Sequence, residues 1–251
     1  MPTLGTKTCK LDSSHATLPA EILTREKMLF WISIALSGIC ILKTQPSRTI
    51  QKWDALFLLS SWQIFNFGVW KNYLANSVNG NPYDIAAILL ILFLFIYIRR
   101  RGITLGWSLS KNNLKIVAQS ILLLAFLLVP LGLQLGFLKI NIKTDPALLA
   151  YTAISYIFLV AIPEELVFRG ILQNLLSRLM MLPLAILISN GIFACIYTHL
   201  TGNDTFPNWT YIGFAFIAGL IYAISYLRSK SIFVPILVHG ITDTIWRMFL
   251  S

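Results

Sequence analysis

Long apolar runs separated by short polar connections occupy the chain from residue 28 almost to its C-terminus. A helix advances about 1.5 Å per residue, so about 20 apolar residues cross the hydrocarbon layer of a membrane. We therefore predict an all-α fold, a polytopic transmembrane helical bundle with about eight membrane helices. The predicted spans are residues 28–42, 55–69, 83–98, 116–138, 147–163 with a continuation, 183–198, 209–227 and 232–249. Residues 1–27 are predicted to form a polar tail before a transmembrane domain at 28–251.

Composition supports a membrane protein. Hydrophobic residues make up 57% of the 251 residues, charged residues only 12%, and the mean hydropathy is +0.73. Soluble domains have about 45–50% apolar and about 25% charged residues. The net charge of +10 comes from Lys and Arg at the ends of apolar runs, where they set membrane topology. Membrane lipid is therefore an expected partner and nucleic acid is not, and the three scattered cysteines form no disulfide or metal motif.

Basic residues in the connections predict the orientation of the spans. The connections after the first, third, fifth and seventh spans contain 12 Lys and Arg, and the other connections with the C-terminus contain four. Basic loops stay cytoplasmic, so the odd connections are predicted to be cytoplasmic. Four Lys and Arg in the tail favour the opposite orientation, which leaves the N-terminal side open. We expect a multi-pass protein, and the lack of an organelle address indicates a bacterial cell membrane.

Ionisable residues inside predicted spans are few and clustered. Insertion of a charged side chain at the centre of a membrane helix costs about 2.5–3.5 kcal/mol, so each one requires a functional or structural reason. The first 140 residues contain no comparable cluster within a span. The candidates are Glu164, Glu165, Arg169, His199, His239 and Asp243.

Helical spacing predicts how these side chains pair. Arg169 follows Glu165 by four residues, about one turn, so the two share a helix face and are predicted to form an ion pair. Glu164 lies about 100° around the helix and is left for chemistry as a general base. His239 and Asp243 share a face of the last helix by the same rule.

Counting residues from the membrane surface predicts how deep each group lies. If an antiparallel helical hairpin has its turn near residues 181–182, Glu164 and His199 lie at the same depth in the membrane. At about 1.5 Å per residue, His239 comes out about 15 Å too shallow, unless residues 173–178 project beyond the hydrocarbon. We adopt that arrangement, which places the site in the cytoplasmic half of the bilayer.

The order of the motifs resembles that of a known family. Glu164-Glu165-Leu-Val-Phe-Arg169 is EExxxR, His199 follows on the next helix, and His239-Gly-Ile-Thr-Asp243 is HxxxD. This order resembles the CPBP (Abi) intramembrane proteases, which include the type II CAAX prenyl endopeptidases, over residues 147–249. The resemblance implies a glutamate-type endopeptidase without metal or cofactor, acting on a peptide or membrane-associated protein. It also implies that Glu164 and His199 activate a water, while His239 and Asp243 stabilise the oxyanion.

Two positions depart from the family pattern. Its second motif is FxxxH, but Cys195 stands four residues before His199, with Phe193 two positions further back. The last position of the third motif is often Asn, whereas Asp243 donates a hydrogen bond only when it is protonated.

Two other functions remain open from the sequence. Glu164, His199 and His239 are also a two-histidine, one-carboxylate set for a zinc-dependent membrane protease, although the HExxH spacing is absent. A non-catalytic membrane scaffold or carrier, for example in self-immunity, could use the same charges as a relay. Chelator sensitivity separates the two proteases, and biological activity that survives Glu164→Gln favours the scaffold. The substrate, its prenylation and the oligomeric state stay open.

Overall fold

The computed structural model describes residues 20–47, 49–72, 82–199 and 207–250, with side chains at 28–47, 49–64, 88–197 and 207–250. Within these residues every regular element is a helix, which confirms the all-α prediction. Each predicted span corresponds to a helix, and the fifth continues to Leu176 as one rod of 31 residues. The helices are α1 (Ala20–Lys43), α2 (Lys52–Asn72), α3 (Pro82–Arg101), α4 (Lys111–Gln134), the rod (Pro146–Leu176), α8 (Leu182–Cys195), α9 (Trp209–Ser229) and α10 (Phe233–Phe249).

By length and composition, three helices of the described chain can cross a membrane: Lys111–Gln134, Pro146–Leu176 and Trp209–Ser229. The protein is therefore an integral membrane protein with a helical bundle. Helix α1 begins at Ala20, inside the expected polar tail. Residues 1–19 lie outside the described residues.

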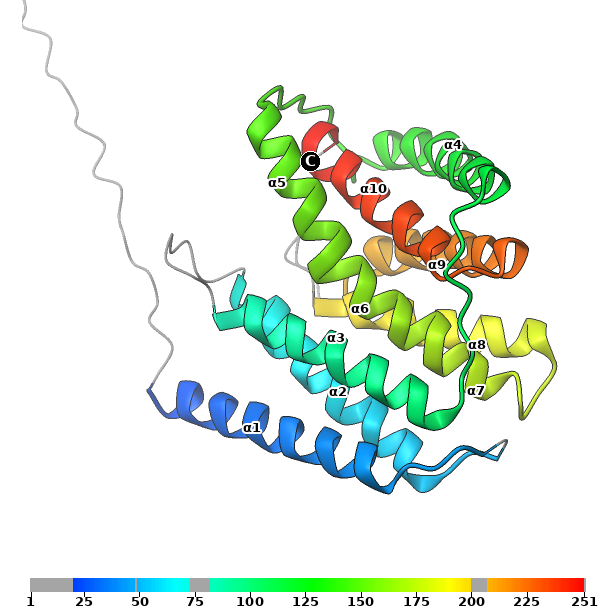
Figure 1. Ribbon diagram of the computed structural model, residues 1–251. Coiled ribbons are helices and arrows are strands. Elements are labelled where there is room, and N and C mark those ends of the chain that lie inside the picture. The colour runs from blue at the N-terminus through cyan, green and yellow to red at the C-terminus, as the bar shows by residue number, and fades with distance from the viewer. Residues whose placement is uncertain (1–19, 48, 73–81, 200–206, 251) are drawn as a thin grey trace, which may run out of the picture.

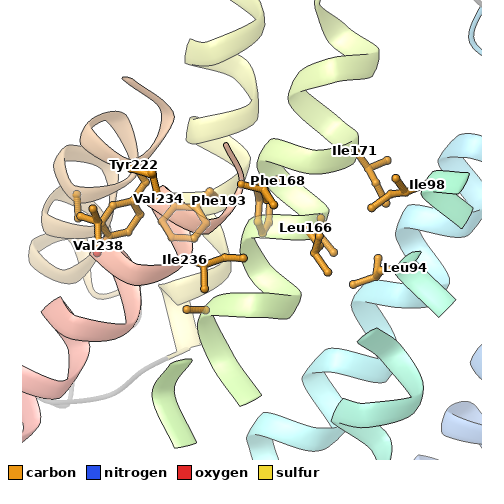
Figure 2. Close-up of a cluster of buried hydrophobic side chains, with 14 of the residues drawn as sticks. Leu94, Ile98, Leu166, Phe168, Ile171, Phe193, Tyr222, Val234, Ile236 and Val238 are labelled. Carbon is orange, nitrogen blue, oxygen red and sulfur yellow. The ribbon is translucent and has the colours of Figure 1, made fainter. Parts of the chain in front are cut away.

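The rod Pro146–Leu176 is the centre of the bundle (Figure 1). Helices α1, α2 and α3 pack together on one side of it, and α4, α9 and α10 lie on its other side. Figure 2 shows both faces in use: Ile98 of α3 lies beside Ile171, while Phe168 points toward Phe193 of α8. The rings of Phe168 and Phe193 meet edge to face with centroids 5.1 Å apart. The C-terminal half of the rod, from Ala161 to Leu175, is thus buried between these two groups of helices, whereas its N-terminal half exposes Tyr151, Ile154 and Phe158.

The rod becomes π-helical in two segments near its middle. It consists of α5 (Pro146–Ser155), the π-helical η1 (Tyr156–Ala161), α6 (Ile162–Glu165), the π-helical η2 (Leu166–Gln173) and α7 (Asn174–Leu176). Pro163 has no N–H and its ring would clash with the carbonyl four residues earlier in a regular helix. The wider turn before it, where the Ile162 N–H donates to the Ile157 carbonyl five residues back, accommodates that ring. A single α-helical turn carrying the two glutamates is thereby held between two π-helical segments.

Helix α10 approaches the rod closely at Gly240. A Cβ atom at Gly240 would lie 2.5 Å from Ile157 Cγ1 and 3.0 Å from Ile157 Cα, far inside van der Waals distance. Small residues allow membrane helices to pack backbone to backbone in this way. The preceding residue, His239, is thereby brought against the rod.

A second buried polar cluster occurs where the sequence suggested none. Asp54, at the start of α2, and Arg101, at the end of α3, form a buried ion pair with Nη2 and Oδ2 2.7 Å apart. Tyr97 donates a further hydrogen bond to Asp54. Arg101 also donates to the carbonyls of Ser47 and Thr49, at 2.6 Å each. Both charges lie at helix ends just outside the predicted spans, where apolar periodicity gives no signal, and they hold the α1–α2 connection in place.

Candidate functional site

Two neighbouring carboxylates of the rod enclose the imidazole of His239 on α10. His239 Nδ1 lies 2.9 Å from Glu165 Oε1, and His239 Nε2 lies 3.8 Å from Glu164 Oε2. All three side chains are buried. Adjacent helical residues point about 100° apart, so Glu164 and Glu165 can face opposite edges of one ring. The His239 ring also stacks on Tyr222 of α9, with centroids 4.7 Å apart, which fixes its plane.

His239 therefore lies deep enough to contact Glu164. Counting residues along the helices had placed it about 15 Å too shallow. The rod ends at Leu176, and residues 177–181 form the turn before α8. Glu164 is consequently 12 residues from the end of its helix rather than 17 from the turn. Close packing of α10 at Gly240 supplies the rest of the approach.

Glu165 anchors an ion pair with Arg169. Arg169 Nη1 lies 3.1 Å from Glu165 Oε1, the same oxygen that lies 2.9 Å from His239 Nδ1. Arg169 Nη2 donates to the Gly219 carbonyl of α9 at 2.7 Å, and it lies 3.5 Å from Asn190 Oδ1 of α8. The buried charge of Arg169 is thus compensated from three helices, as a buried charge requires. Because Arg169 lies inside the rod, it no longer counts among the basic residues of the fifth connection.

Gly219 is a necessary part of this arrangement. A Cβ atom there would lie 2.0 Å from Asn190 Oδ1 and 2.8 Å from a ring carbon of Phe193. The Arg169 guanidinium itself lies over the Phe193 ring, 4.5 Å from its centroid, in a cation–π contact. A side chain at position 219 would therefore displace Asn190 and Phe193, the two residues of α8 that contact Arg169.

Glu164 has a hydrogen-bond partner that the sequence analysis missed. The Tyr197 hydroxyl donates to Glu164 Oε2 at 2.7 Å. Glu164, which was expected to lack the ion pair that Glu165 has, thus has a partner of its own. Tyr197 belongs to a 3₁₀ turn, η3 (Ile196–His199), that follows α8. One signal in the sequence could have found it: Tyr197 stands four residues after Phe193, the spacing that the FxxxH motif gives to its histidine.

His199 is the predicted site residue that the structure leaves undescribed. Its backbone ends the 3₁₀ turn, and its side chain lies outside the described side chains. Its pairing with Glu164 stays a prediction.

Asp243 lies one turn after His239 on α10, with Oδ2 3.4 Å from His239 Nε2. Its side chain is 25% exposed, in contrast to the two glutamates. Asp243 and His239 both line a cavity that is partly open to solvent. Half of the residues that line the cavity are Phe, Tyr or Trp, namely Phe193, Tyr197, Tyr211, Phe214, Tyr222 and Trp246. A polar cluster thus faces an apolar hollow, the combination typical of a ligand site.

Among the described side chains, no three His, Cys, Asp or Glu residues are arranged to hold a metal ion. The zinc alternative required His199 as a third ligand beside Glu164 and His239, and that side chain is not among them. The arrangement that is described contains a buried carboxylate, an imidazole and a further carboxylate at the mouth of a cavity. Such groups can transfer protons and stabilise charge without a nucleophilic Ser or Cys.

Comparison with known families agrees with the order of the motifs. Residues 146–245 match the family model described as type II CAAX prenyl endopeptidase Rce1-like. Comparison with curated proteins and with solved structures gave no match. The matched segment begins with the rod, ends within α10 and contains both glutamates, His239 and Asp243. Residues 146–245 are therefore similar to the Rce1-like type II CAAX prenyl endopeptidases of the CPBP (Abi) family, the family that the order of the motifs indicated.

Proposed function

We propose that the protein is a glutamate-type intramembrane endopeptidase that hydrolyses a peptide bond with a water activated by Glu164. The observation that carries this proposal is the placement of the buried Glu164 carboxylate, with Oε2 3.8 Å from Nε2 of His239, which lines the aromatic cavity. Peptide hydrolysis requires a base for the water, donors for the tetrahedral oxyanion and a site where bulk water does not compete. In this proposal Glu164 is the base, His239 and Asp243 are the donors, and burial of Glu164 limits competition from bulk water.

In the proposed reaction, the Glu164 carboxylate removes a proton from a water as its oxygen attacks the scissile carbonyl carbon. The carbonyl oxygen becomes an oxyanion beside His239 Nε2 and Asp243. Glu164 then passes the proton to the amine as the C–N bond breaks, which regenerates the carboxylate. In this mechanism His239 Nδ1–H donates to Glu165, so a donor at Nε2 requires the imidazolium form, which the Glu165 carboxylate stabilises.

The Glu165–Arg169 pair has a supporting role in this proposal. Glu165 holds the imidazole through Nδ1, and Arg169 in turn holds Glu165 and is tied to the backbone of α9. Fixing the tautomer and the plane of the imidazole allows its other nitrogen to meet the oxyanion without reorganisation. His199 is proposed to assist Glu164 in activating the water, as the family resemblance implies.

The location of the reaction follows from the predicted membrane topology. We propose that all eight helices cross a bacterial cell membrane, with residues 1–27 as a tail, 28–251 as the transmembrane domain and 147–249 as its catalytic core. The site then lies in the cytoplasmic half of the bilayer. A substrate peptide or membrane-associated protein enters through the aromatic cavity, which suits an apolar side chain or a prenyl group near the cleaved bond.

The test is proteolysis by the purified protein in detergent on matched prenylated and unprenylated peptides. Glu164→Gln keeps the side-chain volume but cannot accept a proton, so turnover should fall by at least about 100-fold. Asp145→Asn is the matched control, because Asp145 only caps α5 through the Ala147 N–H and Asn caps equally well. Activity of Glu164→Gln within about tenfold of wild type contradicts the proposal. Loss of wild-type activity on adding a chelator favours the zinc protease instead.

A further inference from the structure

We infer that Tyr197 is the positioning residue that holds the Glu164 carboxylate for proton transfer, an inference that rests on the proposed function. The hydroxyl of Tyr197 donates to Glu164 Oε2 at 2.7 Å, a length typical of a hydrogen bond to a carboxylate. The same oxygen is the one that lies 3.8 Å from His239 Nε2. Tyr197 therefore fastens the carboxylate oxygen that faces the imidazole.

The ring of Tyr197 is itself held in place. It stacks on Tyr211 of α9, with centroids 5.2 Å apart and planes 24° apart, and it meets the Phe193 ring edge to face at 5.4 Å. A phenol clamped between two aromatic rings has little rotamer freedom, so its hydroxyl is directed at one point. Tyr197 also lines the aromatic cavity, which places its hydrogen bond to Glu164 at the edge of the space proposed for substrate.

The chemistry explains why a fixed donor matters here. A carboxylate has two oxygens, and an unheld glutamate can rotate either of them toward the water. With Oε2 accepting from Tyr197, the other oxygen, Oε1, is directed to the water in one orientation. A phenol keeps its own proton near neutral pH, so Tyr197 acts through Glu164 and does not exchange a proton with substrate.

The backbone separates this role from that of His199. Residues 197 and 199 lie in one 3₁₀ turn, where three residues make a turn and positions two apart are about 240° apart. The two positions therefore lie on different faces of η3. The face at position 197 is the one that meets Glu164.

The experiment compares kcat, KM and thermal stability in detergent for wild type and variants at position 197. Tyr197→Phe keeps the stacked ring and removes only the donor. Replacement of Tyr197 by 4-aminophenylalanine restores an N–H donor on the same ring. Tyr226→Phe is the control, because the Tyr226 hydroxyl also has a polar neighbour, Asn174 Nδ2 at 3.4 Å, but takes no part in the site.

We expect Tyr197→Phe to lower kcat by about 10- to 100-fold, the value of a hydrogen bond to a charged group, with KM within about twofold. The amino variant should recover kcat to within about fivefold of wild type, because an N–H donor replaces the O–H. Tyr226→Phe should match wild type in kcat. A merely structural role for the phenol would lower the melting temperature without the specific fall in kcat and its recovery by a donor.

Two outcomes separate this inference from the proposed function. If Glu164→Gln is inactive while Tyr197→Phe stays within about twofold of wild type, the role of Tyr197 is overturned and the protease assignment stands. A large loss in a parallel His199→Gln variant would then assign the partner of Glu164 to His199. If Glu164→Gln is itself active, the proposed function fails and the role of Tyr197 fails with it.

Discussion

Gly240→Ala tests whether the close approach of α10 to the rod is what brings His239 against the glutamates. The added Cβ would lie 2.5 Å from Ile157 Cγ1 and 3.0 Å from Ile157 Cα. Restoring an ordinary separation of 3.4 Å requires a shift of about 0.9 Å for the first atom and about 0.4 Å for the second. The side chain of Ile157 can turn away, but its Cα belongs to the rod, so the helices themselves must separate.

The expected magnitude follows from these distances. Overpacking costs about 1–3 kcal/mol, and the higher helix propensity of Ala offsets up to about 1 kcal/mol of it. The melting temperature should fall by a few degrees, since about 1 kcal/mol shifts it by about 2–4 °C in chains of this size. Activity should fall more steeply, by up to about 100-fold in kcat/KM, because His239 directly precedes Gly240. A displacement of a catalytic group by about 1 Å is enough for such a loss.

The assay is peptide cleavage together with thermal unfolding in one detergent. Gly213→Ala on α9 is the matched control, because a Cβ there meets nothing within 4 Å, so both quantities should match or slightly exceed wild type. Adding Ile157→Ala to Gly240→Ala should recover only part of the loss, since it removes the Cγ1 atom but leaves the backbone of the rod where it is. If Gly240→Ala behaves like Gly213→Ala, close helix packing is not what positions His239.

Three further predictions concern charged residues of the two polar clusters. Glu165→Gln and Arg169→Gln should each lower the melting temperature and the activity by leaving one charge unpaired, and the double variant should lose less than the sum; additivity in the double-mutant cycle would mean that the two do not couple. Asp243→Asn should keep activity and lose the alkaline limb of the pH–rate profile if Asp243 donates to the oxyanion, because Asn donates without ionising; a uniform fall at all pH values would refute the donor role. Asp54→Asn should cost about 3–5 kcal/mol of stability by stranding the Arg101 charge, read as a lower melting temperature, while kcat below that temperature stays at the wild-type value.

Much of the architecture follows from local patterns in the sequence. Each predicted apolar run corresponds to a helix, because a membrane segment must satisfy its backbone hydrogen bonds within itself and therefore has few alternatives to a helix. The spacing of four residues places Arg169 beside Glu165 and Asp243 beside His239, since one helical turn decides both. The order of the motifs was sufficient for the family, which the match over residues 146–245 confirms.

These local patterns did not predict the interactions between helices. The residue count gave too shallow a depth for His239 because it assumed that the helix continued to the turn at residues 181–182, whereas the rod ends at Leu176. Asp54 and Arg101 are 47 residues apart, and no periodicity links them.

Tyr197 is the clearest case of what tertiary structure alone decided. As a tyrosine among apolar residues near a helix end, it is typical of a membrane interface, and its spacing of four residues from Phe193 did not by itself identify its partner. Its hydroxyl reaches Glu164, 33 residues away, because the turn after Leu176 folds α8 back along the rod. Helix formation depends on neighbours within one turn, and the sequence by itself therefore determined the helices and the pairs within them. The partners of Glu164 and His239 depend on how the helices pack, and only the folded bundle decided them.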